Sequence, residues 1–214
     1  MTGIDPDNLA RGERAALADT LVEVGPDRPT LCDGWTTRDL AAHLVLRDRR
    51  PDAAVGILVK PLAGYTAKVQ AELAGRPFEE LVALVRQVPA HSPARLRAVD
   101  QMINTQEYFI HHEDIRRAQP GWQPRPLARR LGEALWSRSQ PLARLGLRRF
   151  PAALLLDAPG YGELSTGGGG PALRVTGDPG ELALFLAGRQ RAARVELTGP
   201  ADLAERLRTR RMGV

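Results

Sequence analysis

The longest stretch of this chain without glycine or proline lies between Pro93 and Pro120, and from Ala94 to Ala118 its apolar residues recur at helical spacing. Glycine and proline are the two strongest helix breakers, so we expect one long helix here, ended by Pro120-Gly121. A helix of this length needs neighbours to cover its apolar face, and antiparallel helices joined by modest loops predict a four-helix bundle. The other helices are expected over 7–24, from near Thr37 after a capping sequence at Thr36 and Asp39, over 78–88 and over 126–142.

The pattern changes after Phe150-Pro151. Short runs of alternating or β-branched residues are separated by glycine and proline clusters, which is typical of strands and turns. We therefore predict a mainly α protein with a four-helix bundle at 1–148 and a smaller α+β domain at 149–214. Strands are expected at 152–156, 163–166, 173–176 and 193–197, and helices at 179–188 and 200–208.

Charge and cysteine content narrow the function classes. The net charge is +5, and of the 30 basic residues only Lys60 and Lys68 are lysine, but the arginines are scattered beside acidic residues. A nucleic-acid surface needs clustered basic residues with aromatic side chains between them, so nucleic-acid binding is a minor hypothesis. Cys32 is the only cysteine, which excludes an internal disulfide. Without a signal-peptide pattern or an apolar run long enough to span a membrane, we expect a cytoplasmic protein with no membrane partner.

The expected long helix carries Glu107 and His111 four residues apart. Side chains at this spacing lie on the same face, roughly 5–6 Å apart at Cβ, which suits two ligands of one divalent metal ion. A third ligand must come from another segment, and His43 is the best candidate. Two imidazoles, one carboxylate and one open position form the ligand set of a catalytic zinc site. The alternative is an ordinary charged helix with solvated histidines.

Helix phase separates the neighbouring polar residues. His112 points some 100° away from His111, so we place His112 and Glu113 off the site. Asp114 shares the stripe of Glu107 and His111 and is predicted to orient a ligating imidazole. The alternative for Asp114 is a surface ion pair with Arg117 or Arg47.

Three further features allow more than one interpretation. Cys32 precedes the helix of His43, where its thiolate would be stabilised, but a single cysteine is also often a small buried apolar residue. His91 lies between two prolines and is expected in a loop. Gly167–Gly170 lacks the following helix and Gly-Lys-Ser/Thr ending of a phosphate loop, so a hairpin turn or flexible loop is expected.

The segments Gly34–Leu44 and Glu107–His111 resemble the metal-binding segments of the mycothiol-dependent maleylpyruvate isomerase group of the DinB-like superfamily, in particular its actinobacterial members of unassigned substrate. The resemblance covers roughly residues 8–145. It implies a DinB-like four-helix bundle that holds a divalent ion, usually zinc, through His43, Glu107 and His111. The C-terminal part is similar to the smaller domain of that family, and the resemblance implies a catalytic role for Arg189.

These features predict a divalent-metal-binding protein, with Zn(II) favoured, that acts as a thiol-dependent S-transferase or isomerase. The resemblance implies mycothiol as the low-molecular-weight thiol, with a small electrophilic or acidic second substrate. The alternative is a non-catalytic metal-binding or sensing module. The two differ at the fourth coordination position: an exchangeable water indicates an enzyme, whereas a protein ligand such as Cys32 or Asp114 indicates a structural or sensory site.

Overall fold

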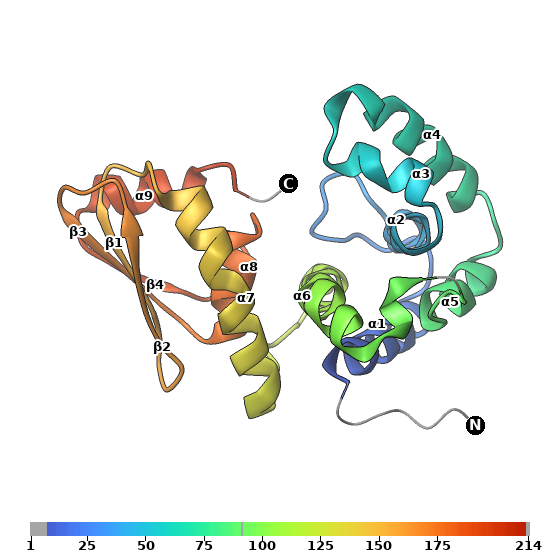
Figure 1. Ribbon diagram of the computed structural model, residues 1–214, viewed down its shortest axis with the longest axis horizontal. Coiled ribbons are helices and arrows are strands. Elements are labelled where there is room, and N and C mark those ends of the chain that lie inside the picture. The colour runs from blue at the N-terminus through green and yellow to red at the C-terminus, as the bar shows by residue number, and fades with distance from the viewer. Residues whose placement is uncertain (1–7, 91, 213–214) are drawn as a thin grey trace. The chain divides into compact units, whose positions relative to one another are not determined.

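The computed structural model describes residues 8–90 and 92–212 and divides into two compact units, residues 1–124 and 125–214. Helices dominate the first unit, and the second contains a small sheet with its own helices (Figure 1), which confirms the expected fold class. Among the described residues, no helix is long and apolar enough to cross a lipid bilayer.

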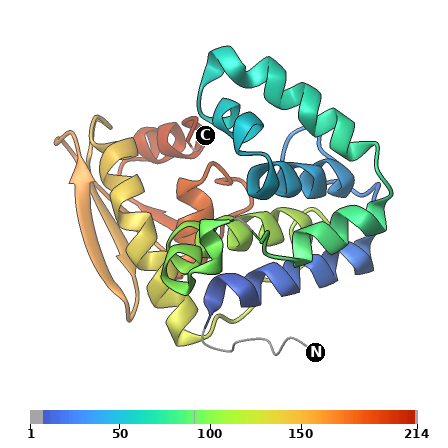
Figure 2. The ribbon, with the colours of Figure 1, turned by 45° about the vertical axis from the view of Figure 1, so that its right-hand side comes forward.

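The N-terminal unit is built from helices at or near the expected positions. The long helix α6 packs along α1, and the two run side by side in Figure 2. The structure adds short helical turns after α2 and one further helix, α4. This helix was not predicted, because the glycine and proline residues at 56–64 indicated a break in the helical pattern. The elements are α1 (Leu9–Val24), α2 (Thr37–Arg49), α3 (Pro51–Ala54), η1 (Val55–Ile57), η2 (Lys60–Leu62), α4 (Ala63–Ala74), α5 (Phe78–Arg86), η3 (Pro93–Arg95) and α6 (Arg97–Arg116).

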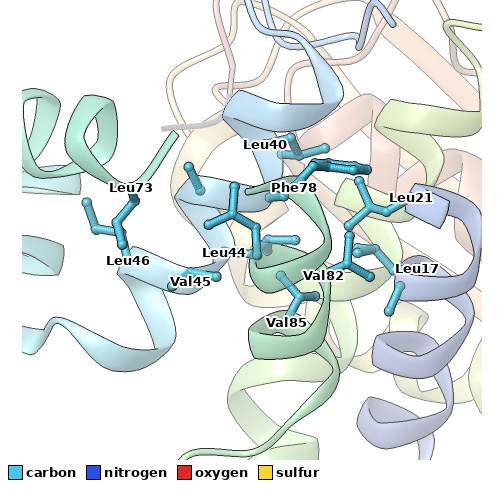
Figure 3. Close-up of a cluster of buried hydrophobic side chains, with 14 of the residues drawn as sticks. Leu17, Leu21, Leu40, Leu44, Val45, Leu46, Leu73, Phe78, Val82 and Val85 are labelled. Carbon is cyan, nitrogen blue, oxygen red and sulfur yellow. The ribbon is translucent and has the colours of Figure 1, made fainter. Parts of the chain in front are cut away.

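The core of this unit lies between α1, α2, α4 and α5. Figure 3 shows side chains from α1, α2 and α5 that point toward one another, with Leu46 of α2 facing Leu73 of α4. Leu17, Leu40 and Leu44 have no exposed surface. Helix α2 is thus held by apolar contacts along its length, which fixes the polar side chains on its remaining face. The labelled core residues are Leu17, Leu21, Leu40, Leu44, Val45, Leu46, Leu73, Phe78, Val82 and Val85.

The C-terminal unit has helices over one face of a four-stranded sheet in the order β2-β1-β3-β4 (Figure 1). Strand β1 pairs antiparallel with β2 and parallel with β3, and β4 is antiparallel to β3. Helix α7, which we expected to close the bundle of residues 1–148, packs on α8 and β2 and lies in this second unit. The elements are α7 (Arg129–Leu147), β1 (Ala153–Ala158), β2 (Gly162–Gly167), β3 (Ala172–Thr176), α8 (Pro179–Leu186), β4 (Glu196–Thr198) and α9 (Ala201–Thr209).

The glycine run 167–170 is not the hairpin turn we allowed for, because β2 and β3 are not neighbours in the sheet. It carries the chain past the first residue of β1, which lies between them: Ala153 pairs with both Gly167 and Ala172. Gly167 has a φ of +96°, and a Cβ there would lie 2.1 Å from the carbonyl oxygen of Ala152. The close backbone crossing therefore explains glycine at this position.

Candidate metal centre

Helix α2 presents His43 in its second turn. Thr36 caps the helix: its side chain accepts from the backbone N–H of Asp39, and the Asp39 carboxylate accepts from the backbone N–H of Thr36 at 2.9 Å. This is the capping box expected from the sequence. With Leu40 and Leu44 in the core on either side, His43 is held at 8% exposure.

Helix α6 brings Glu107 and His111 to the same place. Nε2 of His111 lies 3.8 Å from Oε2 of Glu107, and the rings of His43 and His111 meet edge to face with centroids 5.3 Å apart. Two ligands of a tetrahedral zinc ion, each about 2.0–2.1 Å from it, lie about 3.3 Å apart. The observed separation of these two atoms is close to that value, so Glu107 and His111 are spaced as two ligands of one zinc-type ion would be.

Asp114 sits where it can orient His111. Its carboxylate oxygen lies 2.9 Å from Nδ1 of His111, and the residue has no exposed surface. A carboxylate only accepts hydrogen bonds, so Nδ1 carries the proton and the lone pair is on Nε2, the nitrogen beside Glu107. This contact supports the orienting role and excludes a surface ion pair. Of the partners considered for Asp114, Arg47 pairs with Glu107 and Arg117 pairs with Glu113.

The loop before α2 is tied to the end of α6. The amide of Leu31 donates to the carbonyl oxygen of Asp114 at 2.9 Å, and the thiol of Cys32 donates to the Asp114 carboxylate at 3.3 Å. Thr30 closes the turn by donating to the carbonyl of Trp35, whose ring packs against His43 with centroids 5.0 Å apart. One loop thus covers the ring of one histidine and contacts the carboxylate that orients the other.

Cys32, His111 and Asp114 form a second possible group of ligands, with donor atoms within 4.8 Å of one another. Their separations of 2.9 Å and 3.3 Å are those of hydrogen bonds in which N–H and S–H donate to the carboxylate. These polar atoms satisfy one another directly. Among the described residues, this is the group that brings three such donor atoms within 4.8 Å of one another, and the set of His43, Glu107 and His111 stays a prediction.

The other polar residues of this stretch face away, as helix phase predicted. His112 contacts α1, where Nε2 lies 2.9 Å from Oγ1 of Thr20 and Nδ1 lies 3.5 Å from Glu13. Glu113 is fully buried and accepts from Arg116 and Arg117, each at 2.6 Å. These contacts hold α6 in place. His91 lies outside the described residues.

Arg47 joins Glu107 to the interior, a connection our sequence reasoning missed. Its Nε lies 3.4 Å from the Glu107 carboxylate, and Nη1 donates to Asp48 at 3.2 Å. Asp48 also accepts from Arg14 at 2.8 Å and from the Tyr108 hydroxyl at 2.7 Å. Burial, and then the charge of Asp48, raise the pKa of Tyr108 above its usual range. Arg47 lies four residues after His43 and so on the same face of α2, which is the signal that could have revealed it.

Arg189, to which the resemblance gives a catalytic role, lies in the C-terminal unit just beyond α8. Its Nη1 donates to the carbonyl oxygen of Ala187 at 2.6 Å. The catalytic role of Arg189 stays a prediction.

Residues 9–103 match the family model described as mycothiol maleylpyruvate isomerase N-terminal domain. The matched segment contains α2 with His43 and ends before Glu107 and His111. No curated protein sequence matches the chain.

Two solved structures resemble this chain over most of its length. A crystal structure of the mycothiol-dependent maleylpyruvate isomerase has a TM-score of 0.60 at 17% identity, and the match covers 89% of this chain and 90% of that one. A histidine-to-alanine mutant of that enzyme has a TM-score of 0.59 at 19% identity, with the same coverage. This likeness establishes the fold, and together with the family match it confirms the resemblance inferred from sequence.

Proposed function

We propose that this chain is a divalent-metal-dependent enzyme that uses a low-molecular-weight thiol of the mycothiol type, in an isomerisation or S-transfer on a small electrophilic or acidic substrate. The observation that carries the proposal is the arrangement around His111. Nδ1 is held by the buried carboxylate of Asp114, Nε2 lies 3.8 Å from the Glu107 carboxylate, and the ring of His43 packs against that of His111 with centroids 5.3 Å apart. The family match and the shared fold support the thiol-dependent, isomerase-like part of the proposal.

His43, Glu107 and His111 would hold the ion, and a zinc ion bound there would lower the pKa of a coordinated thiol enough to give a thiolate at neutral pH. The neighbouring residues orient and shield the two histidines. Asp114 holds the tautomer of His111 that leaves Nε2 as an acceptor, and Trp35 shields one side of the His43 ring. Glu107 is 42% exposed at its side chain, which leaves solvent access beside the ligands.

Metal content of purified variants tests the ligand set. We expect His43→Ala and His111→Ala to lose the bound ion and Glu107→Gln to weaken its binding. His112→Ala is the matched control, because this histidine is the next residue on the same helix but contacts Thr20 and Glu13. Wild-type metal stoichiometry in both ligand-histidine variants would refute the assignment.

A non-catalytic metal-binding or sensing module is the second candidate, favoured by the group of Cys32, His111 and Asp114. Cys32→Ser separates the two. In the enzyme the variant keeps its metal, whereas in a module with a thiolate ligand the metal is lost. Absence of both thiol binding and thiol-dependent turnover, when metal-loaded protein is incubated with mycothiol and a panel of electrophiles and cis-dicarboxylates, would favour the module.

Arg189 enters the proposal only through the resemblance. Its predicted role is to contact the acidic substrate or the thiol, where a planar guanidinium pairs with a carboxylate through two hydrogen bonds. Arg189→Lys is then expected to lower turnover and leave the metal content unchanged. Turnover equal to that of the wild type would remove Arg189 from the site.

A further inference from the structure

Arg47 forms an ion pair with Glu107. It also contacts two other residues in the same turn of α6. Nη1 donates to Oδ1 of Asn104 at 2.8 Å, and Nη2 donates to the carbonyl oxygen of Ile103 at 3.1 Å. With Nε 3.4 Å from Glu107, the guanidinium bridges α2 to the α6 turn that carries the carboxylate.

The partners of Arg47 are themselves held by buried groups. Asn104 donates to Oδ1 of Asp100 at 2.7 Å, and Asp100, which has no exposed surface, also accepts from Asn8 of the α1 cap at 3.3 Å. On the other side, Nη1 of Arg47 donates to Asp48, which is fixed by Arg14 and Tyr108. A guanidinium tied to acceptors at both ends has little freedom to rotate.

The geometry indicates what Arg47 does and what it does not do. Nη1 donates two hydrogen bonds and Nη2 donates one, and Nε lies within ion-pair distance of Glu107, so protein groups surround the guanidinium. An arginine that captures a substrate anion needs its planar fork free, and this one is occupied. Glu107 in contrast is half exposed, and a glutamate in that position would otherwise sample several rotamers.

We propose that Arg47 is the positioning residue for Glu107: it holds the carboxylate toward Nε2 of His111 and so organises the metal centre before the ion binds. This inference rests on the proposed function. Groups that orient metal ligands typically change metal affinity by about 10- to 100-fold when they are replaced. We expect a loss of that size in Arg47→Met. Arg47→Lys keeps the charge but lacks the planar fork, and it should restore part of the affinity.

Arg49→Met is the matched control. Arg49 lies on the same helix and donates to the carbonyl oxygens of Leu84 and Gln87, near the end of α5. Its removal is expected to lower the melting temperature and leave metal affinity unchanged. A general loss of stability in α2 is thereby separated from an effect on Glu107.

The test has two measurements: zinc affinity by chelator competition, and the visible absorption spectrum of the cobalt-loaded protein. Both are made on the wild type, Arg47→Met, Arg47→Lys, Arg49→Met, Glu107→Gln and the double variant Arg47→Met/Glu107→Gln. If Arg47 acts through Glu107, its replacement weakens zinc and alters the cobalt spectrum in the wild-type background, and has little further effect when Glu107 is already glutamine. Unchanged zinc affinity in Arg47→Met, or an equal loss in both backgrounds, overturns the positioning role while the metal centre stands. Failure of the wild type to bind either ion overturns the proposed function, and the inference with it.

Discussion

Tyr108→Phe tests the buried polar network between α1, α2 and α6. The Tyr108 hydroxyl donates to Asp48 at 2.7 Å, and the guanidinium of Arg14 lies over the tyrosine ring, 4.4 Å from its centroid. Phenylalanine keeps the ring and removes the hydroxyl. The substitution therefore removes one hydrogen bond to a charged acceptor and leaves the packing of Arg14 in place.

The expected loss of unfolding free energy depends on the hydrogen bonds that Asp48 keeps in the variant. A buried hydrogen bond to a charged group is worth about 1.5–3 kcal/mol. Asp48 still accepts from Arg14 and Arg47 in the variant, so the cost should lie near the lower end of that range. We expect Tyr108→Phe to reduce the free energy of unfolding by about 1.5–2 kcal/mol at pH 8.

The difference in unfolding free energy between the wild type and Tyr108→Phe should become smaller at alkaline pH. The pKa of Tyr108 is raised in the folded protein by burial and by Asp48. In the unfolded chain the phenol loses its proton near pH 10, so above that pH the unfolded state binds fewer protons than the folded state and stability falls as pH rises. Since the folded pKa is above the usual range, this single group costs the wild type about 1.4 kcal/mol by pH 11. Phenylalanine has no proton to lose, so the variant escapes that loss.

Urea denaturation at intervals from pH 8 to pH 11 measures both effects, because every other titrating group is common to the two proteins. Tyr65→Phe serves as the neutral-pH control: its hydroxyl donates to Asp52 on the exposed surface, and we expect a change within about 0.5 kcal/mol at pH 8. A stability gap between the wild type and Tyr108→Phe that stays constant up to pH 11 would refute the buried-phenol argument.

Three other substitutions probe the fold. Leu17→Ala creates a cavity at a side chain with no exposed surface and should cost about 2–5 kcal/mol of unfolding free energy, checked by urea denaturation. Thr36→Ala removes the capping box of α2 and should cost about 1 kcal/mol by the same assay; no change would mean that the cap is not needed. Gly167→Ala combines a positive φ with a Cβ that would strike the carbonyl of Ala152, so it should destabilise the protein by at least 1–3 kcal/mol, with a correspondingly lower melting temperature.

Local signals predicted most of the fold. The absence of breakers in 94–118 and the capping sequence at Thr36 gave α6 and α2 close to their observed bounds. Helix α4 was missed because Pro61 and Gly64 suggested a break, whereas Pro61 lies in η2 and Gly64 near the start of α4, where breakers are tolerated. The hairpin alternative for the glycine run 167–170 was wrong because strand order is set by pairing between distant segments, which no local pattern contains.

The same reasoning applies to the metal centre. Helix phase alone placed Glu107, His111 and Asp114 on one stripe and His112 off the site, because these relations lie within a single helix. The Cys32 contact with Asp114 depends on a loop that folds back to α6, and local patterns cannot predict it. The ligand role of the three residues stays a prediction until metal is measured.

The packing of α6 limits which changes in its amino-acid sequence the protein can accept. Its consecutive residues serve different neighbours: His111 faces α2, His112 faces α1, and Glu113 holds two arginines near the end of the helix. Deleting one residue between Asn104 and Glu107 would rotate everything after it by about 100°, bringing Glu113 toward the buried carboxylate of Glu13. The helix can therefore accept exchanged side chains but not a changed length. Proteins that share this centre should differ by insertions and deletions in the connection between α5 and α6, and keep the spacing within α6 constant.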